Sequence, residues 1–346
     1  MIIPRRWWWT SRLLPGSIKT MANRWGMTIP LGGVPLADHA TVVPALADAG
    51  FTDLWSSEVA GTDAFTPLAL ASAWAPRMRL GTAVAPVYTR GPGLLAMTAA
   101  ALAEAAPGRF QLGIGASSPV VVGDWNAVPF EAPYARSRDM LRFLRAALNG
   151  ELVDESYETF RIRRFRLERP PADPPQLLLA ALRPGMLRLA AAEADGVILN
   201  WLAATDVPTA LAEVSAAGPG FEVAARIFVC PTDDAGYART MGRRLIAAYL
   251  TVPAYAAFHR WLGRTDTLAP MWEAWSAGNR KAAVAAIPDD LVDALIVHGT
   301  PESCRAQVSA YAAAGVTVPV MALLPTPELD AGGPAALAQL LPQLGR

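Results

Sequence analysis

The side chains that could take part in chemistry follow short apolar runs, and most of them are small, hydroxylated or aromatic. Ser57 and Glu58 end one such run, and Asn200 and Trp201 end another. The other residues in comparable positions are Ser56, Ala83, Val84, Tyr88, Thr89, Arg90, Gly115, Ala116, Ser117, Ser118, Ala181, Leu182 and Arg183. Groups of this kind, with few ionisable ones among them, are typical of a site for a flat, partly apolar organic ligand rather than for a metal.

The residues that cofactor-free catalysis needs are scarce at these positions. The three histidines, His39, His259 and His298, are predicted to lie in or beside helices rather than after strands. No cluster of His, Cys, Asp and Glu has metal-ligand spacing, and neither a Gly-x-Ser-x-Gly motif nor a Walker lysine motif occurs. Gly113 and Gly115 form a Gly-x-Gly motif that lacks the third glycine of a dinucleotide fingerprint. The sequence therefore predicts that a bound cofactor supplies the reactive group, and it disfavours a hydrolase or an aldolase.

Composition narrows the class of protein further. Of the 346 residues, 53% are hydrophobic and 17% are charged, which is enough apolar material for a sizeable core. Thirty basic residues balance thirty acidic ones, so the chain lacks the overall charge expected for binding nucleic acid or an anionic membrane. The longest uncharged stretch, 306–327, contains prolines and polar residues and is not typical of a membrane span. Two cysteines are compatible with a reducing compartment, and we expect a cytoplasmic protein.

From Thr28 onward, short apolar or β-branched runs alternate with stretches of helical periodicity. The predicted strands are 28–33, 52–57, 78–85, 109–115, 176–182, 196–200, 223–229 and 316–323. Each is followed by a helical stretch, and Thr300-Pro301 has the pattern of a helix N-cap with proline at the next position. Strands that alternate with helices favour a parallel sheet, and the number of units predicts an α/β fold, a (β/α)8 TIM barrel with insertions. A doubly wound sheet is the alternative.

Three segments depart from this alternation of strands and helices. Residues 1–26 are basic, lack acids and do not have the continuous apolar region of a secretory signal. We interpret them as a disordered or mis-assigned N-terminal extension that precedes a barrel over 27–346. Alternation at period two between proline pairs predicts an inserted hairpin near 151–175. The long helical region 235–287 either lines the site, joins the core or forms a dimer surface.

Several short motifs at the predicted strand ends resemble those of the bacterial luciferase-like superfamily. They are Asp53-Leu-Trp-Ser-Ser-Glu58, Leu80-Gly-Thr-Ala-Val84, Arg109-Phe-Gln-Leu-Gly-Ile-Gly115, Phe160-Arg-Ile-Arg-Arg-Phe-Arg166, Asp195-Gly-Val197 and His298-Gly-Thr-Pro-Glu-Ser-Cys304. The resemblance covers about residues 28 to 345. The chain is most similar to the branch of oxidoreductases that depend on the deazaflavin coenzyme F-420.

The resemblance implies a barrel that binds coenzyme F-420, or alternatively FMN, at its C-terminal mouth. It implies a non-prolyl cis peptide at Ala83-Val84 that bulges against the ring, and a catalytic acid, Glu58, at the ring edge. The implied cofactor-binding residues are Ser57, Glu58, Ala83, Val84, Gly115, Ala116, Ser117, Ala181, Leu182 and Arg183. In that scheme the loop at 115–117 approaches the phosphate and ribityl region, and backbone amides at the helix start after residue 183 bind phosphate.

The chain also departs from the family pattern. Val59 occupies a position where well-studied members often have histidine, and Leu182-Arg183-Pro184 replaces a loop that usually contains glycines. These changes put the proton-transfer role in doubt and leave the substrate open.

The implied function is hydride transfer between coenzyme F-420 and a small organic substrate, without nucleic-acid, membrane or metal partners and with a homodimer as an expected assembly. One alternative is an FMN-dependent monooxygenase that uses oxygen. A second is a cofactor-binding barrel with little catalysis of its own.

Overall fold

The structure, a computed structural model, describes residues 24–346. The interpretation of 1–26 as an extension therefore falls outside the described residues, except for 24–26. These last residues belong to the barrel, because Trp25 is 1% exposed and Gly26 begins the first strand, β1 (Gly26–Thr28). The predicted domain boundary and the predicted first strand both begin too late, because Trp25 was grouped with the basic residues that precede it.

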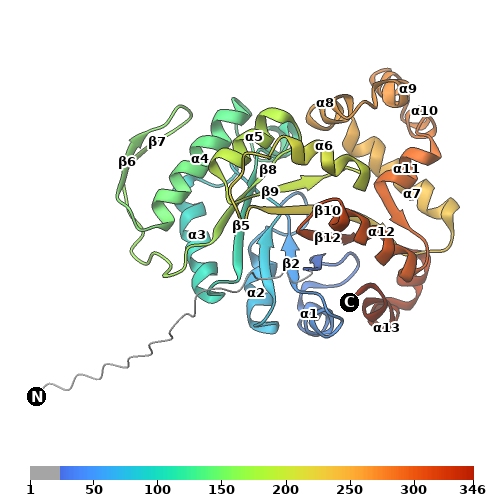
Figure 1. The fold of residues 1–346 in the computed structure, drawn as a ribbon, viewed down its shortest axis with the longest axis horizontal. Coiled ribbons are helices and arrows are strands. Elements are labelled where there is room, and N and C mark those ends of the chain that lie inside the picture. Colours follow the sequence, from blue (N-terminus) through green and yellow to red (C-terminus); the bar gives the residue numbers. More distant parts are fainter. Residues whose placement is uncertain (1–23) are drawn as a thin grey trace, which may run out of the picture.

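Among the described residues, eight parallel strands close into a ring, which confirms the predicted (β/α)8 barrel (Figure 1). The ring consists of β1, β2 (Asp53–Ser56), β3 (Arg79–Thr82), β5 (Phe110–Gly115), β8 (Gln176–Ala180), β9 (Gly196–Asn200), β10 (Glu222–Cys230) and β12 (Val318–Leu323). β12 pairs with both β1 and β10, and β10 also pairs with β9. This closure excludes the doubly wound alternative, whose sheet is open.

Helices surround the ring and follow the strands as predicted. They are the short η1 (Leu36–Asp38) and η3 (Ala204–Asp206), and α1 (His39–Asp48), α2 (Thr66–Trp74), α3 (Pro92–Ala105), α4 (Pro133–Leu148), α5 (Pro184–Glu193), α6 (Val207–Ala212), α12 (Pro301–Ala313) and α13 (Pro327–Leu344). Proline occupies one of the first positions of several helices, where its missing N–H is tolerated. The Thr300 hydroxyl accepts from the Ser303 amide at 3.1 Å, so the predicted N-cap is confirmed.

The interior of the barrel is a packed apolar layer. Trp55, Leu178, Ile198, Ala224, Val318 and Val320 form it, and all are nearly inaccessible to solvent. The indole of Trp55 fits because Gly81 on the neighbouring strand has no side chain: a Cβ there would lie 2.5 Å from the ring. The barrel therefore has a solid floor beneath its mouth, as is usual for this fold.

Two insertions leave the barrel on different sides (Figure 1). Within 151–175, β6 (Val153–Ser156) and β7 (Arg161–Phe165) pair antiparallel and project beyond α4. The second insertion contains α7 (Ala235–Leu250), α8 (Pro253–Trp261), α9 (Thr265–Ser276), α10 (Arg280–Ala285) and α11 (Asp289–Leu295). These helices pack over the ends of β9 and β10.

The sequence analysis missed two short strands. β4 (Ala85–Pro86) continues along β5 after β3 ends, and β11 (Ile296–His298) pairs with the end of β10. His298 therefore ends a strand, contrary to its predicted place beside a helix, although its Nε2 lies 3.0 Å from Asp293 Oδ1 and not in the barrel mouth. Three residues are too few to show a strand periodicity, so the sequence carried no signal for β11.

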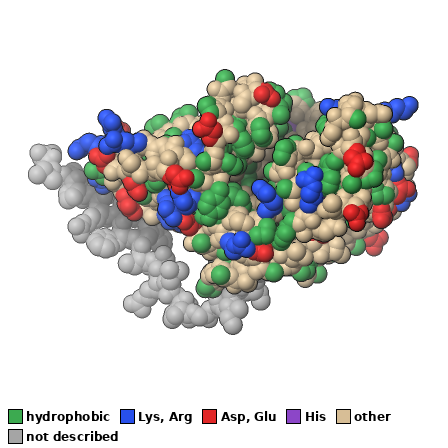
Figure 2. Space-filling model, turned by 90° about the horizontal axis from the view of Figure 1, so that it is seen from above, with side chains coloured by type: hydrophobic (Ala, Val, Ile, Leu, Met, Phe, Trp, Pro, Cys, Tyr) green, Lys and Arg blue, Asp and Glu red, His purple; other side chains and the backbone are tan. Residues whose placement is uncertain are grey.

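The surface mixes basic, acidic and hydrophobic side chains, as expected from a chain with equal numbers of basic and acidic residues. On the face drawn in Figure 2, basic and acidic side chains are interspersed among hydrophobic ones. Over residues 24–346, none of the helices combines the length and the apolarity needed to span a bilayer.

His259 in α8 is completely buried, and neither ring nitrogen has a hydrogen-bond partner among the described residues. Burial, and secondarily the positive charge of Arg264, lowers its pKa to about 3. The folded state therefore holds the neutral ring, whereas the unfolded chain takes up a proton near the ordinary pKa of about 6.5. The stability that depends on the neutral ring is complete above that pH and is lost as the pH falls toward 3, at no more than about 1.4 kcal/mol per pH unit.

We expect the free energy of unfolding of the wild type to fall between about pH 6.5 and about pH 5 more steeply than that of His259→Leu. Denaturant titrations at both pH values measure this, and His298→Gln is the control because His298 is paired with Asp293. Equal losses in the wild type and in His259→Leu would contradict the prediction.

Candidate active site

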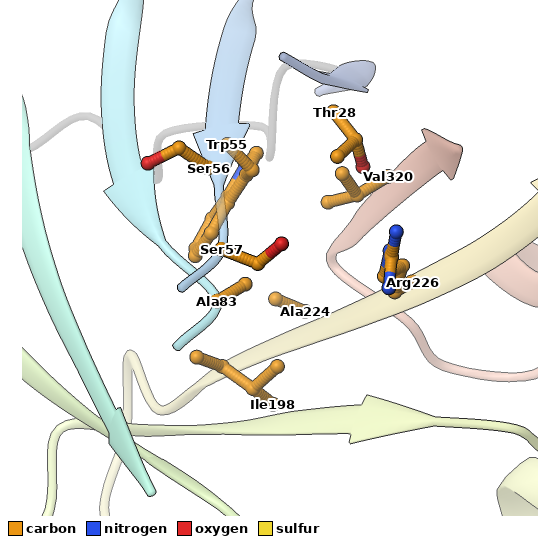
Figure 3. A pocket seen from close by; sticks show the side chains of 9 residues that line it. All are labelled: Thr28, Trp55, Ser56, Ser57, Ala83, Ile198, Ala224, Arg226 and Val320. Atoms are coloured by element: carbon orange, nitrogen blue, oxygen red, sulfur yellow. The ribbon is translucent and has the colours of Figure 1, made fainter. Parts of the chain in front are cut away.

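A small pocket opens at the centre of the barrel where the strands end (Figure 3). Its lining consists of Thr28, Trp55, Ser56, Ser57, Ala83, Ile198, Ala224, Arg226 and Val320. Side chains alternate along a strand, so residues two positions beyond the apolar floor again point inward. Ser57 follows Trp55 in this way, and Arg226 follows Ala224. The pocket is therefore the first layer above the packed core.

The Ala83-Val84 peptide bond, on one wall of this pocket, is cis, as the resemblance implied. The Ala83 amide donates to the Ser56 carbonyl at 2.6 Å, and the Glu58 amide donates to the Val84 carbonyl at 3.3 Å. The loops after β2 and β3 are thus tied together at the backbone. Ser57 and Ala83, both predicted site residues, meet in the pocket as a result.

Gly113 on β5 supports the same wall from behind. The regular pairing of β5 shifts from β3 to β4 around this residue, which interrupts the ladder of backbone hydrogen bonds. The Thr82 hydroxyl fills the gap: it donates to the Gly113 carbonyl at 2.7 Å and accepts from the Gly113 amide at 2.9 Å. One buried side chain thereby satisfies both backbone groups that the bulge leaves unpaired.

The carboxylate of Glu58 is engaged in an ion pair rather than aimed into the pocket. Arg90 donates to Oε2 at 2.8 Å, the Ala64 amide donates to the same oxygen at 3.2 Å, and the Thr89 hydroxyl donates to Oε1 at 3.3 Å. Arg90 also lies 3.4 Å from Asp63. Glu58 is absent from the pocket lining, so its catalytic role stays a prediction that the apo geometry does not favour.

Asp63 shares this network and is held as an anion. Burial raises its pKa, but hydrogen bonds from Thr66 and Phe65 and the charge of Arg90 together outweigh burial and leave the pKa below its ordinary value. The network therefore fixes the loop after β2 at neutral pH.

The loop after β5 has an unusual backbone. Gly115 is buried at the strand end, and a Cβ there would lie 3.0 Å from both Val84 and Ala180. Ser117 has φ 63°, and the same connection contains a π-helical turn, Val120–Trp125, and two further residues of positive φ, Ala127 and Ala132. Such backbone conformations in non-glycine residues gather at functional sites.

The loop after β8 lies near the mouth but outside the pocket. Ala181 is 1% exposed, Leu182 is half-buried and Arg183 is exposed at the start of α5. Of the predicted site residues, the pocket brings together Ser57 and Ala83, whereas Val84, Gly115, Ala116, Ser117 and the three residues of this loop are not part of its lining.

Sequence reasoning missed Arg226 and Thr28 as site residues. Arg226 is the one charged residue in the run 223–229, and at period two it shares a face with Ala224 and Phe228. That signal was available, because a charged side chain in an otherwise apolar barrel strand points either to the floor or to the mouth. The Nε of Arg226 and the Oγ1 of Thr28 are buried and have no hydrogen-bond partner among the described residues.

Aromatic side chains at the ends of β9 and β10 pack against those of the second insertion. The Trp201 ring lies 4.3 Å from the Phe228 ring and 4.9 Å from the Tyr249 ring, and Arg226 stacks on Phe228 at 4.8 Å. Asn200 Nδ2 donates to the Tyr255 hydroxyl at 3.1 Å. Burial raises the pKa of Tyr255 to about 12, so it remains a neutral phenol.

Metal chemistry has no support in residues 24–346, where no group of three or more His, Cys, Asp and Glu side chains is arranged to hold an ion. The two cysteines, Cys230 and Cys304, are free and buried, and burial raises both thiol pKa values, that of Cys230 to about 11 and that of Cys304 to about 12. They are thiols rather than reactive thiolates at neutral pH.

Comparison with known proteins agrees with this architecture. The sequence pattern of the luciferase-like monooxygenases matches residues 17–318. A protein of Mycobacterium tuberculosis whose name places it among the coenzyme F-420-dependent oxidoreductases is 30% identical, over 84% of this chain and 92% of its own length.

Solved structures with a similar fold include one named for dependence on coenzyme F-420 and one in complex with FMN. The coenzyme F-420-dependent tetrahydromethanopterin reductase of Methanopyrus kandleri has a TM-score of 0.74 at 20% identity and covers 93% of this chain and 97% of its own. The oxygenating constituent of 3,6-diketocamphane monooxygenase from Pseudomonas putida, in complex with FMN, has a TM-score of 0.64 at 17% identity. The match covers 94% of this chain and 97% of that one.

Proposed function

The chain belongs to the luciferase-like monooxygenase family, and on that premise we propose that it transfers a hydride between the deazaflavin coenzyme F-420 and a small organic substrate. The observation that carries the proposal is the pocket itself. Its walls offer hydroxyl, aromatic and aliphatic groups and one guanidinium, but no carboxylate and no histidine. A mouth so poor in acids and bases needs a bound redox group for any oxidation or reduction.

The residues at the mouth fit a planar ring of this kind. Ala83 lines the pocket, and Gly115 lies so close behind Val84 that a Cβ there would be 3.0 Å from the Val84 side chain. Ser57, Glu58, Ala116 and Ser117 would border the ring and its ribityl chain. The deazaflavin ring, when bound, supplies the carbon that accepts or gives the hydride, and the protein supplies position and exclusion of water.

The phosphate group of the cofactor has a matching set of donors at the loop after β8. Arg183 is exposed there, and α5 begins directly after it with its first amides free of helical partners. A helix N-terminus beside a guanidinium attracts phosphate. We therefore assign Ala181, Leu182 and Arg183 to the phosphate end of the cofactor rather than to the pocket.

An FMN-dependent monooxygenase is the second candidate, because a structural neighbour with the same barrel is in complex with FMN. A barrel that binds a cofactor without turnover is the third. An expected homodimer also stays a prediction.

A fluorescence titration of the purified protein with coenzyme F-420 and, separately, with FMN tests the proposal. We expect F-420 to bind with a dissociation constant of about 10 µM or tighter and at least tenfold more tightly than FMN, a difference of about 1.4 kcal/mol. The deazaflavin core without its phosphate serves as the matched ligand and should bind more weakly. Preference for FMN, together with oxygen consumption in the presence of reduced FMN, would favour the monooxygenase, and binding of neither would refute both.

A further inference from the structure

The pocket lining contains hydrogen-bond donors that have no acceptor among the described residues. Three lining residues, Thr28, Trp55 and Arg226, each have a buried polar atom without a partner among the described residues: Oγ1, Nε1 and Nε respectively. The indole and guanidinium nitrogens can only donate, and a hydroxyl can donate. Buried polar atoms are nearly always paired, so a set of unpaired donors around one pocket indicates a ligand that accepts hydrogen bonds.

The charge of the pocket also indicates a ligand that accepts hydrogen bonds, and specifically an anion. Arg226 carries a full positive charge, and the nine lining residues include no carboxylate to balance it. The guanidinium lies 4.8 Å from the Phe228 ring, which holds it in place without neutralising it. By contrast Arg90, which stands at the rim, is paired with both Glu58 and Asp63. An unbalanced, partly buried cation is costly unless a ligand pairs with it.

We propose that Arg226, with Thr28 and Trp55, binds the oxyanion of the substrate, so that the substrate is a small organic acid. Arginine presents a planar fork that matches a carboxylate, and the remaining donors can meet its second oxygen. Figure 3 shows Arg226 across the pocket from Ser57 and Ala83. The proposed cofactor ring lies against the wall that these two residues form. The pocket is small at this depth, so only the anionic end of the acid enters it.

The inference rests on the proposed function for its identification of the ligand as the substrate, but the anion site can be tested without the cofactor. Purified cofactor-free protein is titrated at low salt with a panel of small carboxylates and sulfonates, among them acetate, lactate, pyruvate, benzoate and methanesulfonate, and with the amides of the carboxylates. Tryptophan fluorescence and the thermal midpoint Tm report binding, since Trp55 lines the pocket. We expect at least one acid to bind and its amide not to bind.

Arg226→Met tests the residue, because it keeps the length of the side chain and removes the charge and the donors. We expect acid binding to weaken at least tenfold in Arg226→Met and less in Arg226→Lys, and deazaflavin binding to change less than threefold. Arg163→Met, on the exposed face of the inserted hairpin, is the matched control and should bind like the wild type. The Tm of Arg226→Met should equal or exceed that of the wild type, since the substitution removes an unpaired charge.

Three results would overturn the inference. If the wild type binds no acid, the anion site does not exist. If Arg226→Met binds the acid as tightly as the wild type, Arg226 is not part of the site. A loss of deazaflavin binding in Arg226→Met as large as the loss of acid binding would show that Arg226 serves the cofactor instead. Failure of the wild type to bind any flavin would refute the proposed function and leave the anion site to its own test.

Discussion

Replacing Gly113 with alanine is expected to lower the free energy of unfolding by about 3 kcal/mol or more and to abolish cofactor binding. A Cβ at this position would lie 1.9 Å from the Thr82 carbonyl oxygen and 2.4 Å from Ile198 Cδ1. The first of these atoms belongs to the backbone directly before the Ala83-Val84 bulge, so it cannot move aside without moving the pocket wall. The effect should therefore reach stability and the site together.

Thr82→Val separates the steric effect at Gly113 from the loss of its hydrogen bonds, because it keeps the volume of the side chain and removes the hydroxyl. Both the amide and the carbonyl of Gly113 then lose their partner in a buried environment, which costs about 1–3 kcal/mol for each group. Denaturant unfolding and the deazaflavin titration measure both variants. Gly61→Ala is the control, since a Cβ there meets nothing within 4 Å. If Gly113→Ala behaves like Gly61→Ala, the close approach of Thr82 is not a constraint.

The barrel was predictable from the sequence because its signals are local and repeated. Glycine and proline end or begin most units, and the apolar runs are long enough to show their periodicity. The observed β9 (Gly196–Asn200) coincides with the predicted run 196–200 for this reason. β4 and β11 were missed because two or three residues cannot show a period, and only pairing with β5 and β10 makes them strands.

The site was predictable only in part. The resemblance located the Ala83-Val84 bulge, because the motif that carries it is contiguous in the sequence. It could not show that Arg90 would reach back to Glu58 across 32 residues, since a long side chain selects its partner only in the folded state. Arg226 was missed because the strand that carries it reads as buried, and the direction of a single side chain depends on the register of the whole barrel.

The start of the barrel was misplaced because two residues there act through distant partners. Trp25 donates from Nε1 to the Leu344 carbonyl at 3.0 Å, close to the C-terminus. Arg24 pairs with Asp53 and Glu222 and donates to Gln111 at 3.1 Å. Asp53 and Glu222 begin their strands, so this cluster closes the amino-terminal end of the barrel, opposite the pocket. No pattern within 1–26 could reveal these contacts.

Arg24→Met is accordingly expected to destabilise the fold by about 3–5 kcal/mol, although Arg24 lies far from the mouth. The substitution leaves Glu222, at 7% exposure, without a cation, and it leaves Asp53, at 1% exposure, with only the Nε of Arg79 at 3.9 Å. Asp53→Asn in the Arg24→Met background should recover part of the loss, because it removes one of the two buried carboxylate charges, and a double-mutant cycle measures the coupling. Arg77→Met, an exposed arginine near the same end, should stay within about 0.5 kcal/mol of the wild type. A loss below about 1 kcal/mol for Arg24→Met would mean that water reaches these carboxylates and that residues 24–26 do not close the barrel.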